Sequence, residues 1–221
     1  MIPLRDTNPS NTFPIVNYSI IAVNVVVFFY ELSLGAELGQ MFLLLGVVPQ
    51  KFSADIQTLN IDLGTIQPFF TSMFLHGGWM HLIGNMLFLY VFGDNIEDKF
   101  GKGKYILFYF FCGFAAALTQ VYINPESHIP MIGASGAIAG VLGAYVVMFP
   151  KARVFAVVPM IIFYRAMELP AFLFLGFWFL MQVISGMLSL GIGGDAGGVA
   201  FWAHIGGFVC GVALVPLLKK Q

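Results

Sequence analysis

The chain has 221 residues, of which 59% are hydrophobic and 10% charged, with a formal net charge of −1 and a mean hydropathy of +0.87. Soluble domains carry about 25% charged residues. The composition therefore excludes an ordinary soluble domain and predicts a single polytopic membrane domain over residues 1–221. The near-zero net charge gives no indication of nucleic-acid binding. Cys112 and Cys210 both fall in apolar stretches and are expected to be free thiols.

Six apolar stretches approach the length of about 20 residues that a membrane-spanning helix needs. We expect them to form an all-α bundle of six transmembrane helices. The stretches are 15–34, 78–97, 104–123, 134–149, 169–190 and 198–218. The first follows a single basic residue and lacks a clear small-residue cleavage site, so we interpret it as a membrane anchor rather than a signal peptide.

Two further apolar segments, 43–48 and 154–164, are too short to span a bilayer. The first belongs to the long connection 35–77. We expect both to be interfacial or re-entrant segments.

Positive charge predicts the orientation of the bundle. Nine of the ten Lys and Arg residues fall at the two termini or in alternate loops, and only Lys51 falls on the other side. The positive-inside rule places the majority side, and hence both termini, in the cytoplasm. The loops 35–77, 124–133 and 191–197 then face outward. Because no transit peptide or long soluble domain is apparent, we expect a prokaryotic inner membrane.

Ser135 and His204 are polar residues inside predicted membrane helices. Ser135 lies in a Gly-Ala-Ser-Gly segment at the start of the fourth stretch, and His204 in an Ala-His-Ile-Gly-Gly segment near the start of the sixth. Ionisable groups are costly in hydrocarbon, so an intramembrane histidine indicates a functional site. Each residue precedes a cytoplasmic edge, Pro150 or Lys219, by 15 positions, or about 22 Å of helix. We therefore expect both side chains at one depth, on the outward side.

His81 and Asn85 extend this polar layer. They are four residues apart in the second stretch and so share a helix face. Acyl transfer needs a nucleophile, a base and donors for the developing oxyanion. We expect Ser135 to attack a carbonyl, with His204 taking the serine proton and later giving it to the leaving amine. We expect His81, Asn85 and the Ser135 backbone N–H to stabilise the oxyanion. No carboxylate lies within the helices of Ser135 and His204, which favours a dyad over a triad.

Each residue taken alone also has a structural interpretation. Small residues spaced for helix packing occur near both Ser135 and His204, and an asparagine in a membrane helix often bonds to a neighbouring helix. The small residues are Gly136, Gly140, Gly143, Ala203, Gly207 and Gly211. His76 and His128 lie in outer loops, where we expect a surface or structural role. The five-residue spacing of His76 and His81 is not typical of a metal site, and we expect no metal or cofactor.

The three motifs together, in this order and over nearly the whole chain, resemble the rhomboid family of intramembrane serine proteases. The resemblance implies a Ser135–His204 dyad, an oxyanion site of His81, Asn85 and the Ser135 main chain, and no metal or cofactor. It also implies transmembrane protein substrates in the lipid bilayer, with single-pass proteins among them. The resemblance further implies that the fifth stretch acts with loop 191–197 as a lateral gate. This stretch is rich in bulky aromatic residues, most of which we expect to face lipid.

Two positions depart from the family. Some rhomboids carry a tyrosine one turn after the serine, packed against the catalytic histidine, where this chain has Ala139. Some carry a Trp-Arg pair in the first outer loop, where Gln67 and Pro68 stand. A catalytically inactive rhomboid-like module that binds membrane clients is the main alternative, although such modules typically lack the serine or the histidine. A transporter or channel is disfavoured because no predicted span has a central charge.

Overall fold

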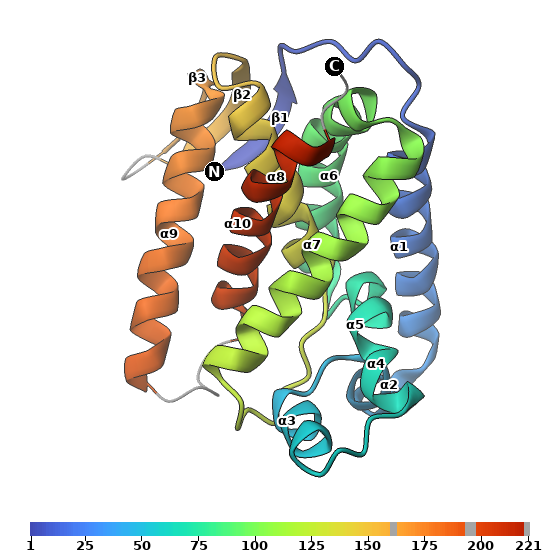
Figure 1. The fold of residues 1–221 in the computed structure, drawn as a ribbon. Helices are drawn as coiled ribbons and strands as arrows, with labels where there is room; N and C mark the ends of the chain where they lie inside the picture. The colour runs from blue at the N-terminus through green and yellow to red at the C-terminus, as the bar shows by residue number, and fades with distance from the viewer. Residues whose placement is uncertain (160–162, 193–197, 219–221) are drawn as a thin grey trace.

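Six long helices run side by side and form the body of the molecule (Figure 1). The computed structural model describes residues 1–159, 163–192 and 198–218. Among these residues, the helices of 14 residues or more are α1 (Ile15–Ser33), α6 (Trp79–Phe100), α7 (Lys102–Ile123), α8 (Ser135–Met148), α9 (Ala171–Ile192) and α10 (Phe201–Leu218). Each overlaps one of the six predicted stretches, with ends within three residues of those predicted.

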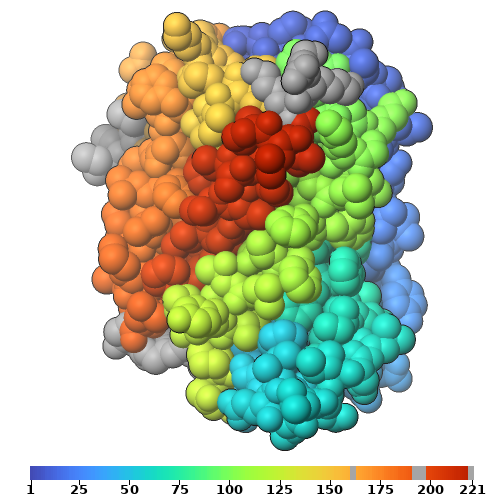
Figure 2. Space-filling view, viewed as in Figure 1, coloured from blue at the N-terminus to red at the C-terminus, as the bar shows by residue number. Residues whose placement is uncertain are grey.

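The connection between α1 and α6 folds into a lobe of short helices at one end of the bundle, which we call the lobe end (Figure 2). Its elements are η1 (Gly35–Glu37), α2 (Leu38–Leu45), α3 (Pro49–Gln57), α4 (Leu63–Ile66), α5 (Pro68–Thr71) and η2 (Ser72–Phe74). An isolated β-bridge joins Val47 to Met131. This bridge ties the lobe to the segment that leads into α8.

A three-stranded antiparallel sheet covers the opposite end, which we call the sheet end (Figure 1). β2 (Arg153–Pro159) lies in the middle, between β1 (Ile2–Asp6) and β3 (Tyr164–Pro170). The all-α expectation is therefore wrong at this end, because residues 154–159 belong to β2 and residue 164 begins β3. The interfacial or re-entrant placement of residues 154–164 stays a prediction. β3 also takes the first two residues of the predicted fifth stretch, so α9 begins at Ala171.

Alternating burial explains why the segment is a strand. Val154 and Ala156 are fully buried, whereas Arg153 is exposed, which is the two-residue period of a strand with one face on a core. A short apolar run is compatible with either a strand or a buried helix. The strand β1, about 150 residues earlier in the chain, decides between them by pairing with β2.

Four of the described helices, α1, α7, α9 and α10, are long and apolar enough to cross a membrane. α6 is as long as α7, but its last two turns carry Asp94, Glu97, Asp98 and Lys99. α8 is apolar but has only 14 residues.

Glycines bring α8 and α10 into backbone contact. A Cβ atom on Gly207 would lie 2.0 Å from the carbonyl oxygen of Gly136, and one on Gly211 would lie 2.0 Å from that of Gly140. These distances are far below van der Waals contact, so residues with side chains are excluded. The predicted packing role of the small residues is confirmed, and this contact holds the start of α8 against the start of α10.

Candidate active site

Ser135 and His204 meet at the contact between α8 and α10. Ser135 is the first residue of α8, and His204 lies in the first turn of α10. The Oγ atom of Ser135 and the Nε2 atom of His204 are 2.8 Å apart, across 69 positions of sequence. Both side chains are half-buried. This is a well-formed hydrogen bond, and it allows the imidazole to take the hydroxyl proton.

Helix α9 holds the opposite side of the His204 ring. Nδ1 of His204 lies 2.8 Å from Oε1 of Gln182. Trp178, one turn earlier in α9, lies beside the imidazole with the ring centroids 5.9 Å apart and the planes inclined by 35°. The family's tyrosine position is occupied by the fully buried Ala139. The support for the histidine therefore comes from α9 rather than from α8.

The aromatic residues of α9 divide between lipid-facing and inward positions. Phe172 and Phe177 are about half exposed, as predicted for a lipid-facing helix. Phe174 is fully buried, and Trp178 packs on His204. Phe179 also lies on the face of α9 that contacts the bundle, since its ring stacks on that of Phe208 with the centroids 4.5 Å apart. The prediction that most of these five aromatic residues face lipid is therefore wrong for three of them.

His81 and Asn85 lie against the segment that enters α8. A Cβ atom on Gly133 would lie 2.7 Å from Nε2 of His81 and 3.7 Å from Nδ2 of Asn85. Gly133 has a φ of +120°, a conformation that favours glycine. The backbone N–H of Gly77 makes a long contact of 3.4 Å with Nδ1 of His81. As an acceptor Nδ1 carries no proton, so the proton of a neutral ring is on Nε2, on the side of Gly133.

His76 is buried and contacts the Asn85 amide. Nδ2 of Asn85 lies 3.0 Å from Nε2 of His76, and the His76 backbone N–H donates to the carboxylate of Glu31 at 3.1 Å. Burial, together with the nearby His81, lowers the pKa of His76 to about 4. The ring is therefore neutral at pH 7 and can accept a hydrogen bond from Asn85, which leaves the second N–H of that amide available. The structural role expected for His76 is observed, but inside the protein rather than on its surface.

Two cavities adjoin this arrangement at the lobe end. The larger has a volume of about 570 Å³ and is lined by the loop before α8, the start of α10 and the last turns of α9, with His81 and Gln120 among its polar groups. The smaller, about 40 Å³, lies beside Ser135, and a volume of this size admits about one water molecule. Both cavities are lined by Met131, Ile132 and Ala200, so they lie next to each other.

Comparison with known proteins identifies the family. The family model described as the Rhomboid domain matches residues 64–221, which is well over half of the chain. The chain belongs to the rhomboid family. Members of this family are in general intramembrane serine proteases that act on transmembrane substrates within the lipid bilayer.

Several rhomboid relatives share extended similarity with this chain. Rhomboid-like protein 11, chloroplastic, from Arabidopsis thaliana is 32% identical over 69% of this chain and 52% of its own length. Rhomboid protease AarA from Providencia stuartii is 28% identical over 89% of this chain and 69% of its own length. Rhomboid protein 1, mitochondrial, from Saccharomyces cerevisiae is 29% identical over 67% of this chain and 39% of its own length.

This chain thus spans about half the length of the chloroplastic relative. The relatives include chloroplastic and mitochondrial proteins beside a bacterial one. Family membership supports a multi-pass integral membrane protein but does not support a prokaryotic inner membrane in particular.

Sequence reasoning about this rhomboid missed three residues that contact the site. Gln182 is a polar residue in the middle of an apolar helix, and this signal was as strong as that of Asn85. Trp178 lies four residues before it, on the same helix face. His76 stands five residues before His81, and the bend at Gly77 and Gly78 separates it from α6; its ring lies 5.0 Å from that of His81. Most of the predicted loop 191–197 lies outside the described residues.

Proposed function

We propose that this rhomboid is a serine endopeptidase that hydrolyses peptide bonds in or near transmembrane segments of membrane proteins. The observation that carries the proposal is the 2.8 Å contact between Oγ of Ser135 and Nε2 of His204. A serine and a histidine in hydrogen-bond contact are the nucleophile and base of acyl transfer. Because both residues lie within the helical bundle of a membrane protein, we propose that the substrates are membrane proteins.

The reaction follows from these two groups. His204 takes the proton of Ser135 as Oγ attacks the scissile carbonyl carbon, and gives that proton to the leaving amine as the C–N bond breaks. A water molecule then attacks the acyl-enzyme, with His204 again as base, and releases the carboxylate product and free Ser135. The cavity of about 40 Å³ beside Ser135 has room for that water.

Donors at the start of α8 would stabilise the oxyanion. The N–H groups of the first helical turn have no partner within the helix, and the helix dipole is positive at this end. Nε2–H of His81 and the second N–H of the Asn85 amide lie against Gly133, two residues before Ser135. We assign the oxyanion site to these two side chains and the backbone N–H of Ser135. The chemistry needs no metal or cofactor.

The membrane arrangement is part of the proposal. We infer that α6 and α8 cross the bilayer together with the four long apolar helices, in one domain of six spans over residues 1–221. Basic residues of the strands, of the last turn of α6, of the first turn of α7 and of the α8–β2 connection lie at the sheet end, whereas Lys51 lies in α3 at the lobe end (Figure 1). The positive-inside rule then places the sheet end in the cytoplasm and lets the active site open on the other side. Helix α9 would be the lateral gate.

The alternative is an inactive rhomboid-like module that binds membrane clients without cutting them. It requires that the Ser135 hydroxyl be unreactive. The hydrogen bond to His204 argues against that condition, since it is the contact that activates a serine. Reactivity of this hydroxyl is therefore the property that separates the two functions.

A serine-directed fluorophosphonate probe tests the proposal. The purified protein in detergent should be labelled and should cleave a model single-pass substrate, and Ser135→Ala should abolish both. Ser19→Ala is the matched control, because the Ser19 hydroxyl is bonded back to the Ile15 carbonyl of its own helix at 2.7 Å. Cleavage that persists in Ser135→Ala would overturn the mechanism. Binding of the substrate by an unlabelled, inactive wild-type protein would favour the alternative.

A further inference from the structure

Gln182 presents its side-chain amide to His204 in a single orientation. The amide nitrogen Nε2 of Gln182 donates to the backbone carbonyl of Trp178 at 3.2 Å, one turn earlier in α9. An amide nitrogen is only a donor and the amide oxygen is only an acceptor. With the nitrogen bound to Trp178, the oxygen Oε1 is the atom that faces His204, at 2.8 Å.

The orientation of this amide determines the tautomer of His204. Because Oε1 can only accept, the Nδ1 atom of His204 must carry a proton. In a neutral imidazole the proton on Nδ1 leaves Nε2 with a free lone pair. Nε2 is the atom 2.8 Å from the Ser135 hydroxyl. Gln182 thus selects the one neutral form of the ring that can accept the serine proton.

The contact also sets the direction of the ring. Oε1 of Gln182 and Oγ of Ser135 bind opposite edges of the imidazole, and Trp178 packs beside it. A serine protease triad uses an aspartate for this purpose. A neutral amide performs the same orientation without placing a second charge in a low-dielectric environment, where a charge is costly.

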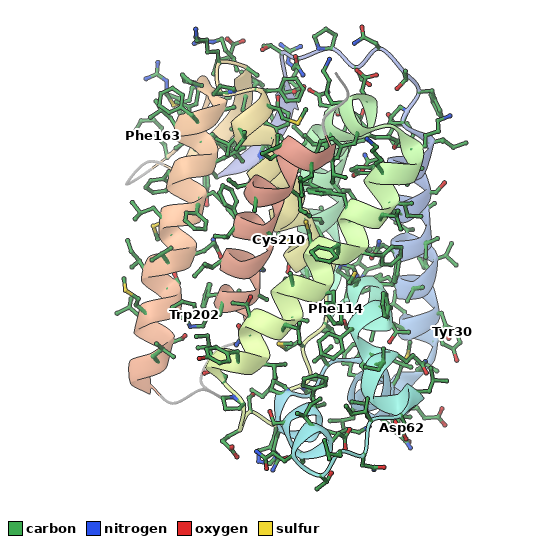
Figure 3. The ribbon with its side chains drawn as sticks, viewed as in Figure 1. Tyr30, Asp62, Phe114, Phe163, Trp202 and Cys210 are labelled. Atoms are coloured by element: carbon green, nitrogen blue, oxygen red, sulfur yellow. The ribbon has the colours of Figure 1, made fainter. Side chains whose placement is uncertain are left out.

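The two side chains that hold His204, those of Gln182 and Trp178, come from a helix that contributes neither residue of the dyad. Ser135 and His204 belong to α8 and α10, whereas Gln182 and Trp178 belong to α9. Towards the lobe end, α9 packs on α10 where Gly186 approaches the indole of Trp202, which Figure 3 shows between the two helices. The position of α9 therefore controls the orientation of the catalytic histidine.

We propose that Gln182 is a positioning residue, whose amide oxygen fixes the tautomer and direction of His204 and makes the dyad competent only when α9 is packed on α10. The inference rests on the proposed protease function. It assigns to a helix outside the dyad a role in catalysis itself, in addition to any role in substrate entry.

Three variants at position 182 test this role, with steady-state cleavage of a single-pass substrate as the measurement. Gln182→Met keeps the length of the side chain but removes the acceptor, and should lower kcat by about 10- to 100-fold with KM within about twofold. Gln182→Asn keeps the amide but withdraws it by one methylene, and should also lower kcat. Gln182→Glu retains an oxygen acceptor for Nδ1–H in either protonation state, and should recover activity to within about tenfold of wild type.

The control is Met181→Leu, at the neighbouring, exposed position of α9, which should leave kcat unchanged. Wild-type kcat in Gln182→Met would overturn the positioning role, and so would a Gln182→Glu enzyme as slow as Gln182→Met. Either result would leave the protease function intact if cleavage still depends on Ser135. Loss of the proposed function would instead appear as a wild-type protein without Ser135-dependent cleavage.

Discussion

The two ends of the bundle both contain buried polar groups, but they use them differently. At the sheet end, Asn17 and Tyr105 are fully buried and Glu97 is 1% exposed. The Tyr105 hydroxyl donates to Oδ1 of Asn17 at 2.7 Å, and Nδ2 of Asn17 donates to the Leu89 carbonyl at 3.0 Å. The Glu97 carboxylate accepts the backbone N–H groups at the start of α1. We call Asn17, Glu97 and Tyr105 the sheet-end cluster.

In the part of the chain that the structure describes, the lobe end has side-chain donors that the observed contacts leave free. Nε2 of His81 and Nδ2 of Asn85 lie beside Gly133, and the contacts that hold the two side chains leave one N–H on each of these nitrogens available. A cavity of about 570 Å³ reaches His81, and a smaller one reaches Ser135. The side chains of the sheet-end cluster pack tightly against their surroundings, since a Cβ atom on Gly93 would lie only 2.1 Å from Oδ1 of Asn17.

We interpret this difference as one between polar groups that stabilise the fold and polar groups that serve the proposed reaction. A buried group whose partners are all internal contributes to stability, because removing one member leaves another unsatisfied. A group with a free donor beside a cavity is available to a ligand. The sheet-end cluster should therefore affect unfolding and hardly affect turnover, whereas Ser135, His204 and Asn85 at the lobe end should mainly affect turnover.

The largest effect is expected for His204→Ala. Without the base, kcat should fall by about 10⁴-fold or more, as for removal of a member of a serine protease triad. The melting temperature should fall less than in Asn17→Ala, because the partners of His204, Ser135 and Gln182, are only half-buried and can bond to water instead. Parallel cleavage and thermal denaturation assays in detergent measure both. A large drop in melting temperature would break the distinction between the two ends.

A matched pair of asparagines sharpens the comparison. Asn85→Ala should lower kcat by about 10²–10³-fold with residual cleavage, because one oxyanion donor is worth about 2.7–4 kcal/mol. Asn17→Ala should leave kcat within about threefold but lower the melting temperature by about 5–10 °C, since the buried Tyr105 hydroxyl loses its acceptor. Equal effects of the two variants on turnover would show that the ends do not differ as inferred, and a wild-type rate for Asn85→Ala would remove its oxyanion role.

The smallest effect concerns the pH dependence of stability at the lobe end. His76 has its pKa lowered to about 4 by burial, from an ordinary value of 6.5. Between these values the unfolded chain binds more protons at His76, so the contribution of His76 to the free energy of unfolding falls as the pH drops through this window. From pH 6.5 to 5 this contribution falls by about 2 kcal/mol, which corresponds to roughly 4–8 °C in melting temperature relative to a protein without the histidine.

His76→Gln supplies the reference for that experiment, because its amide oxygen can still accept from Asn85 but does not titrate. Over pH 7 to 5 the melting temperature of the wild type should fall relative to that of the variant. Identical pH dependence in the two proteins would mean that His76 is not buried in its neutral form.

Much of the helical framework was predictable from composition and periodicity. Each of the six long helices overlaps an apolar stretch, because a spanning helix must satisfy its own backbone in a continuous apolar run. The strand β2 was not predictable, because Val154 to Pro159 is equally compatible with a helix until β1 pairs with it. The small residues predicted that α8 and α10 each pack closely on another helix, since only such residues allow carbonyl contact, but they did not predict that the two helices pack on each other.

The candidate site was predictable in part for the same kind of reason. Polar residues are expensive in an apolar helix, so Ser135, His204 and Asn85 were conspicuous without any structure. Gln182 was equally conspicuous in chemistry, but its partner could not be inferred, because its contact with His204 depends on how α9 rotates and packs. His76 was hidden because a loop residue carries no periodic signal.

The sequence by itself determined that this chain is a membrane protein and predicted which polar residues share one depth, since hydrophobicity and helical rise are local properties. Its three motifs supplied the resemblance to the rhomboid family. The tertiary structure alone decided which edge of the His204 ring faces Ser135, which helix supports that ring, and which buried polar groups keep a free donor. These are properties of contacts between helices, where a rotation by one residue exchanges one partner for another.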